Sequence, residues 1–275
     1  MQSTLTTMVS STANPFPSFP LTGIQFPTTP LVLSSYKHAK KYSTPGVLNH
    51  VLRSAAFCLL LQKKMPEFAK LGDALDVELV VVSCLLHDLA WTKTKELVTN
   101  TRRFEVDGAN LARDFIDTTL EKDGDWSKNG RRMQLAWDAI ALHTMEAFAP
   151  WKEPEVALVH YGIHGDLLGP SLHLLGLPDD LPNLKGAMTN EEFKEICNAF
   201  PRMHFAEEFK EIFCGLCRDR GRYTFDSTVV HYGMEWGYDG RGTGVEEFNK
   251  VVEDAQRAKN LYGVMSSIDE LADEA

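Results

Sequence analysis

Four side chains in three segments carry the chemistry that this sequence suggests: His50, the adjacent pair His87 and Asp88, and Asp166. Each can donate a lone pair to a metal ion, and three of them fall within otherwise apolar helical runs. An ionisable group on a buried face is costly unless it is paired or binds an ion. Two imidazoles and two carboxylates suit a hard or borderline divalent cation and leave positions for water and substrate. The four residues therefore predict a catalytic metal site.

The hydrophobic pattern around these residues predicts helices that bring them together. Thr44 and Pro45 open a helix as its N-cap and first-turn proline, and the apolar stripe that follows turns His50 inward. A second helix places His87 on its buried face near its C-terminal end, and a later helix has Asp166 in register with its apolar positions. Ligands on separate helices can converge only in the core of a bundle, where metal sites are commonly built.

Helical periodicity continues along most of the chain, and no run of alternating strands is present. Further helices are predicted at residues 104–120, 131–145, 190–200, 203–219 and 245–262. The fold class predicted is all-α, a helical bundle with the metal site in its core. We divide the chain into three parts: an extended, Pro- and Ser-rich N-terminal arm at 1–30, one helical domain at 31–265, and an acidic tail at 266–275.

The composition of the chain limits the classes of molecule with which the protein could interact. The chain has 275 residues, of which 44% are hydrophobic, enough to bury a full core. A net charge of −10 without a block of Lys or Arg argues against nucleic acid, and no apolar run approaches the length of a membrane span. The absence of a signal-peptide pattern and five irregularly placed cysteines predict a cytoplasmic protein. We expect a small-molecule substrate, no nucleic acid and no membrane, and the N-terminal arm could reach the second subunit of a homo-oligomer.

The four residues also resemble a known signature. His50, His87-Asp88 and Asp166 look like the H…HD…D pattern of the HD-domain metal-dependent hydrolases. More narrowly, four stretches resemble the cyanamide hydratase-like branch of that superfamily: Asn49-His50 with Arg53, CLLHDLAWT at 84–92, TRRFEVDGAN at 101–110 and NAFPR at 198–202. The resemblance implies an all-α HD fold and one divalent metal ion, zinc in the cyanamide hydratases. It also implies a hydratase or hydrolase reaction in which metal-bound hydroxide adds to a small electrophile such as a C≡N bond. Iron and manganese suit the same ligand types.

One departure from this branch bears on the substrate. His143-Thr144-Met145 stands where the cyanamide hydratases carry His-Glu-Asp, so the substrate of this chain could differ. His143 faces the same predicted core as His50 and is expected to act catalytically, as a proton shuttle or substrate contact, together with Asp88. The alternative for His143 is a hydrogen-bonded histidine of the core.

Five further residues are expected to contact the substrate: Asn49, Arg53, Trp91, Arg103 and Glu105. Each has a structural alternative. Arg53 could pair with a carboxylate such as that of Asp88, the charged residues at 102–107 could form a solvated helix start, and Trp91 could simply pack.

A second metal ion would need two additional histidines, and His143 with His160 or His164 superficially fits. His160 and His164 lie about 120° and about 160° around their helix from Asp166. This phase favours a single metal ion and a polar-surface or local hydrogen-bonding role for both.

The leading hypothesis is therefore a metal-dependent HD-domain hydratase or hydrolase acting on a small nitrile-like or amide-like substrate. An alternative is an HD phosphohydrolase acting on a nucleotide or small phosphomonoester, for which Arg53, Arg102 and Arg103 would supply cations. The third possibility, a non-catalytic HD ligand-binding module, is disfavoured because no ligand of the signature is missing.

Overall fold

The computed structural model describes residues 14–91, 94, 97–120, 126–127, 130–257 and 261–273, and among these it contains helices and no strand. The all-α prediction is thus confirmed. The α-helices are α1 (Pro30–Tyr42), α2 (Pro45–Lys64), α3 (Pro66–Ala69), α4 (Val77–Leu86), α5 (Phe104–Thr119), α6 (Arg131–Ala141), α7 (Pro154–Leu168), α8 (Asn190–Ala199), α9 (Phe205–Arg220), α10 (Val229–Trp236), α11 (Val245–Arg257) and α12 (Leu261–Asp273).

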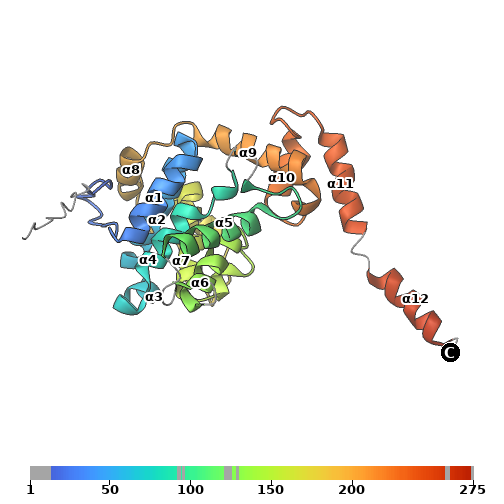
Figure 1. The fold of residues 1–275 in the computed structure, drawn as a ribbon, viewed down its shortest axis with the longest axis horizontal. Helices are drawn as coiled ribbons and strands as arrows, with labels where there is room; N and C mark the ends of the chain where they lie inside the picture. Colours follow the sequence, from blue (N-terminus) through green and yellow to red (C-terminus); the bar gives the residue numbers. More distant parts are fainter. Residues whose placement is uncertain are drawn as a thin grey trace, which may run out of the picture.

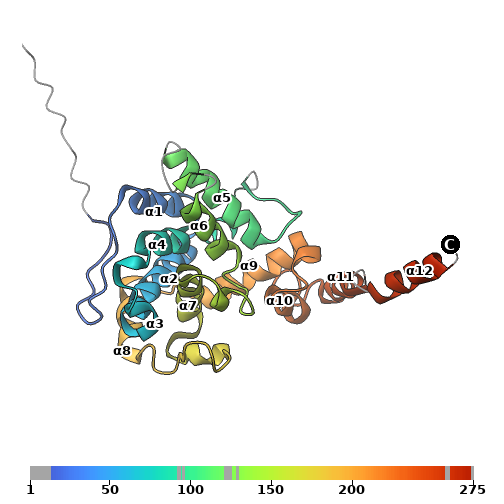
Figure 2. The same ribbon diagram turned by 90° about the horizontal axis from the view of Figure 1, so that it is seen from below.

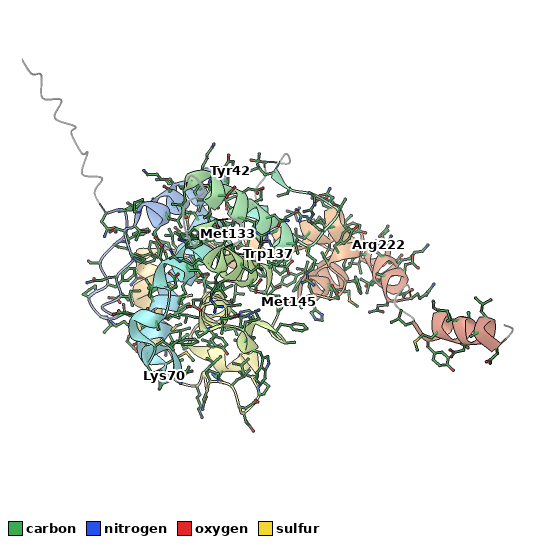
Figure 3. The ribbon with its side chains drawn as sticks, turned by 60° about the horizontal axis from the view of Figure 1, so that its bottom comes forward. Tyr42, Lys70, Met133, Trp137, Met145 and Arg222 are labelled. Atoms are coloured by element: carbon green, nitrogen blue, oxygen red, sulfur yellow. The ribbon has the colours of Figure 1, made fainter. Side chains whose placement is uncertain are left out.

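Helices α2, α4 and α7 form the centre of the bundle, and α1, α5 and α6 pack around them (Figure 1). The sequence of α4, VELVVVSCLL, is apolar on every side, and its residues from Leu79 to Leu86 are all buried. A helix that is hydrophobic all round can be stable only when neighbours cover it completely. Figure 3 shows the dense packing around α6, where Met133 is fully buried and the indole nitrogen of Trp137 donates a hydrogen bond to Asn110 at 3.0 Å.

Local sequence signals set where the site-bearing helices begin. The hydroxyl of Thr44 accepts a hydrogen bond from the amide of Val47 at the start of α2, and the carboxylate of Asp76 accepts one from Leu79 at the start of α4. Helix α6 ends at Ala141, earlier than predicted. His143 therefore lies in the turn after this helix and not on its face.

The described part of the N-terminal arm packs on the bundle. Phe16 and Phe26 are buried and stack with their ring centroids 4.5 Å apart. The amides of Leu21 and Thr22 donate to the carboxylate of Glu195 in α8 at 2.7 and 2.9 Å. These contacts tie the arm to α8 by both apolar burial and hydrogen bonds.

The C-terminal third contributes a second, smaller core. Helices α9, α10 and α11 enclose Phe213, Phe248 and Val252, which are buried. Helix α12 has no buried residue and stands apart from the body in both views (Figures 1 and 2). It includes most of the predicted tail, which is thus helical to Asp273. Among the described residues, no helix has the length and apolar character needed to cross a membrane.

Candidate metal centre

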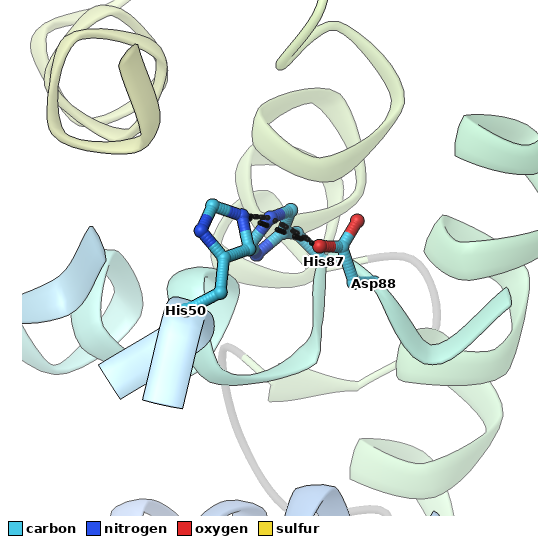
Figure 4. A group of neighbouring side chains, drawn as sticks. All are labelled: His50, His87 and Asp88. Carbon is cyan, nitrogen blue, oxygen red and sulfur yellow. Dashed lines mark hydrogen bonds and ion pairs between the residues drawn. The ribbon is translucent and has the colours of Figure 1, made fainter. Parts of the chain in front are cut away.

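Three of the four predicted ligands converge in the bundle core (Figure 4). Nε2 of His50 from α2 lies 3.3 Å from Nε2 of His87, which follows the last turn of α4. Oδ2 of Asp88 lies 3.0 Å from Nε2 of His87 and 3.4 Å from Nε2 of His50. All three residues are buried, so their donor atoms share one small volume shielded from bulk water.

The contacts of these side chains test whether the cluster suits a cation. Nδ1 of His87 lies 2.8 Å from the carbonyl of Cys84, and Nδ1 of His50 lies 2.6 Å from a carboxylate oxygen of Asp166. These acceptors assign the ring protons to the Nδ1 atoms and leave lone pairs on both Nε2 atoms. Neither carboxylate oxygen of buried Asp88 has a hydrogen-bond partner among the described residues. Two lone pairs and an orphaned carboxylate oxygen facing one another fit a divalent cation.

Burial and neighbouring charges place these groups in the ionisation states that bind metals. Burial lowers the pKa of His50, although the hydrogen bond and charge of Asp166 oppose this shift. For Asp88, burial acts to raise the pKa, but the imidazoles of His87, 3.0 Å away, and His50 outweigh it and the pKa lies below its ordinary value. A neutral imidazole and an ionised carboxylate are the forms required of ligands.

Asp166 lies on the opposite side of the His50 ring from the other donors. Its carboxylate accepts hydrogen bonds from Nε and Nη2 of Arg53 at 2.6 and 2.9 Å and from Nη1 of Arg202 at 2.8 Å, in addition to its contact with His50. Although burial raises the pKa of Asp166, these contacts lower it to about 2. Asp166 was predicted as the fourth ligand; in the described structure its carboxylate contacts Nδ1 of His50 and is not in the group formed by His50, His87 and Asp88.

Asn49 and Arg53, which were predicted to contact the substrate, form hydrogen bonds to other parts of the chain. Arg53 is fully buried, and its Nη1 donates to the carbonyls of Phe200 and Pro201, both at 3.1 Å. The side-chain amide of Asn49 donates to the carbonyl of Pro201 at 2.8 Å. The alternative in which Arg53 pairs with a carboxylate matches the structure, with Asp166 as the partner in place of Asp88. Neither Asn49 nor Arg53 lines the cavity at the metal centre.

A cavity of about 50 Å³ adjoins the cluster. Its lining combines imidazole, aromatic, aliphatic and hydroxyl side chains: His50, His87, Trp91, His143, Thr144, Ile163, His164, Leu167, Phe209, Phe213 and Thr228. No arginine or lysine side chain is among these described lining residues. The cavity is thus small and offers no fixed positive charge.

His143 and His164 both belong to this lining. Nδ1 of His143 lies 2.6 Å from the carbonyl of Ile140, and Nδ1 of His164 lies 2.9 Å from the carbonyl of His160. The ring protons are assigned to these contacts, which leaves an Nε2 lone pair on each ring. Burial is the main reason that the pKa of each is lowered to about 4. Both imidazoles are therefore neutral at pH 7.

His164 makes the local contact with the carbonyl of His160 that was expected, and its ring also lines the cavity. His164 and Asp166 point to different sides of α7. Asp166 contacts Nδ1 of His50, whereas His164 lines the cavity. Its position in an otherwise apolar helix was the available signal. His160 is buried beside the site, where its Nδ1 contacts the carbonyl of His143 at 2.8 Å, and it is not part of the lining.

Thr144 is hydrogen-bonded to the buried carboxylate of Glu105. The hydroxyl of Thr144 donates to Oε1 of Glu105 at 2.6 Å, and Nη2 of Arg103 donates to the same oxygen at 2.8 Å. Arg103 also pairs with Asp226 at 3.2 Å. Glu105 and Arg103 are not among the described lining residues, and Glu105 is linked to the cavity through the hydroxyl of Thr144, which donates its hydrogen bond to Glu105. This link was not evident from sequence because Thr144 and Glu105 are 39 residues apart along the chain.

Trp91 is the one predicted substrate residue whose side chain lines the cavity in the described structure. Its ring stacks on His50 with centroids 6.1 Å apart and an interplanar angle of 12°. The edges of Phe209 and Phe213 meet it, each with its centroid 5.7 Å away.

Comparison with known proteins places this centre in a family context. Residues 47–159 match the family model of the HD domain. The matched stretch runs from the first turns of α2 into α7 and carries His50, His87 and Asp88. No curated protein matches the chain. The matched segment carries the buried His-His-Asp cluster, and the described helices form an all-α bundle that fits an HD fold.

Proposed function

We propose that this protein is a metal-dependent HD-domain enzyme that adds water to a small uncharged electrophile, with a C≡N group as the leading candidate. The main support is the size and lining of the cavity beside the His-His-Asp cluster, about 50 Å³ without a cationic side chain among its described residues. A cavity that holds one water molecule needs a volume of roughly 10–15 Å³, whereas pockets for drug-sized ligands span about 300–1,000 Å³. The space suits a molecule of a few heavy atoms.

His50, His87 and Asp88 would hold the metal ion, with zinc as the first candidate and iron or manganese also compatible with this donor set. A divalent ion so placed lowers the pKa of a coordinated water towards neutrality and polarises an electrophile. Asp166, through Nδ1 of His50, fixes the direction of the Nε2 lone pair.

The remaining groups of the lining would recognise the substrate through hydrogen-bond acceptors. His143 and His164 carry Nε2 lone pairs, and the hydroxyl of Thr144 donates its hydrogen bond to Glu105, so its oxygen can accept one. A small molecule with N–H donors, such as an amino-substituted nitrile, matches this set. His143 would take up a proton as water is added, since it is neutral at pH 7 and faces the same cavity as His50.

The phosphohydrolase alternative receives less support. The arginines that it requires are engaged elsewhere: Arg53 with Asp166, Arg103 with Glu105 and Asp226, and Arg102 with Asp107 at 3.5 Å. A phosphoryl group is stabilised during transfer mainly by cations aimed at its oxygens. A nucleotide is also far larger than the cavity.

The test combines metal analysis with a substrate panel. Purified protein is loaded in turn with zinc, manganese or ferrous iron, and turnover is measured on cyanamide, simple nitriles, small amides and phosphomonoesters. We expect one bound ion per chain and turnover of the nitrile-like compounds. Asp88→Asn should lose both, whereas Asp117→Asn, a partly exposed carboxylate of α5, should keep both. Full metal content in Asp88→Asn, or turnover of phosphomonoesters alone, would refute the proposal.

A further inference from the structure

A second and much larger cavity shares Trp91 with the small cavity at the metal centre. Its volume is about 590 Å³, and it runs between α9 and the segment that follows α4. Its lining includes Trp91, Glu208, Ile212, Arg218, Asp219 and Arg220. Trp91 is the one residue common to this lining and that of the small cavity.

The position of Trp91 is fixed by the metal-binding turn itself. Its amide donates to the carbonyl of Asp88 at 2.9 Å, within the short 3-10 helix Leu89–Trp91. One face of the indole lies over His50, and its remaining surroundings include Phe104, Phe209 and Phe213. The indole thus stands beside a metal ligand, between the two spaces.

The indole ring is positioned by packing. Its Nε1–H is buried and has no hydrogen-bond partner in the described part of the chain. Buried tryptophan nitrogens usually find a partner, which anchors the ring. Here the aromatic contacts alone hold the ring that separates the two cavities, and a smaller side chain at this position would connect them.

We propose that Trp91 is the partition that sets the upper size limit of ligands at the metal centre, an inference that rests on the metal site of the proposed function. With the indole in place, only compounds of a few heavy atoms fit beside His50 and His87. Without it, the small cavity joins the larger one, and compounds with a longer substituent can reach the metal. Trp91 is a specificity-determining residue.

The charges of the large cavity indicate which substituents it would accept. Arg220 is engaged by Asp107 at 2.9 Å, and Arg218 by Asp219 at 2.8 Å. Glu208 accepts a short hydrogen bond from the hydroxyl of Thr44. Because both arginines already pair with carboxylates, the merged cavity favours a neutral aromatic or alkyl substituent over an anionic one.

The test measures ligand binding instead of turnover. The full chain is loaded with cobalt(II), and its visible absorption is followed during titration with azide, a three-atom probe, or with 4-phenylimidazole, which carries a bulky substituent. Wild-type protein should bind azide and exclude 4-phenylimidazole. Trp91→Ala should bind 4-phenylimidazole at least about tenfold more tightly than wild type, with azide affinity changed less. Ile212→Ala enlarges only the large cavity and should behave as wild type.

Trp91→Phe, which keeps an aromatic ring in the wall, gives a smaller gain and serves if the alanine variant fails to fold. Tight binding of 4-phenylimidazole to wild type, or no gain in a folded Trp91 variant, would overturn the partition while leaving the proposed function standing. A chain that takes up no cobalt would refute the metal centre, and the inference with it.

Discussion

Replacing Asp166 with Asn separates two roles that this carboxylate could have: a direct metal ligand, or the group that orients His50. The substitution keeps the shape of the side chain and removes its charge. Arg53, fully buried, would then lose the partner that it meets through Nε and Nη2 at 2.6 and 2.9 Å. Removing one partner of a buried ion pair costs about 3–5 kcal/mol, because the other charge remains buried. We therefore expect the metal-free Asp166→Asn variant to be less stable by this amount.

The effect on metal affinity should be smaller than that of losing a ligand. Loss of a partner that orients a metal-bound histidine typically costs about 10–100-fold in affinity. Asp166→Asn should therefore bind zinc about 10–100-fold more weakly than wild type, whereas Asp88→Asn should bind none at the site. Stability is measured by urea unfolding of the metal-free proteins, and affinity by competition with a chromophoric chelator.

The double variant Arg53→Met with Asp166→Asn provides the control. It removes the uncompensated charge and should recover part of the lost stability without restoring metal affinity. If Asp166→Asn left the metal-free protein as stable as wild type and abolished metal binding as completely as Asp88→Asn, Asp166 would be a direct ligand and the assignment made from this geometry would be wrong.

Three further outcomes follow from the same contacts. Because the pKa of Asp166 is lowered from 3.8 to about 2, its contribution to stability is fully present above the unfolded value and is lost as pH falls towards 2; urea unfolding between pH 5 and pH 2 should show a loss of roughly 2 kcal/mol that is missing in Asp166→Asn. Thr144→Val removes the acceptor linked to Glu105 and should lower turnover at least about tenfold with metal content unchanged; unaltered turnover would exclude the hydroxyl from substrate recognition. Glu195→Gln weakens the hold on Leu21 and should speed protease cleavage within residues 14–29, relative to Lys194→Gln; equal cleavage rates would show that the buried phenylalanines alone fix this segment.

Local physics explains which parts of the site could be predicted from sequence. Helix starts depend on neighbouring residues, so the cap at Thr44 was recognisable and lies where the structure has it. The inward direction of His50 and His87 follows from helical periodicity, and both are buried. The amino-acid sequence by itself therefore determined the all-α class and the His-His-Asp set at its centre.

Only the tertiary structure decided how the remaining groups meet. Helical phase says that a residue faces the core, but the crossing of α2 with α7 sets which side of the His50 ring Asp166 takes. That same crossing brings His164 to the cavity. The Thr144 link to Glu105 and the wall formed by Trp91 likewise join segments that are distant along the chain, and the space between the segments, which no local pattern encodes, sets the size of the substrate.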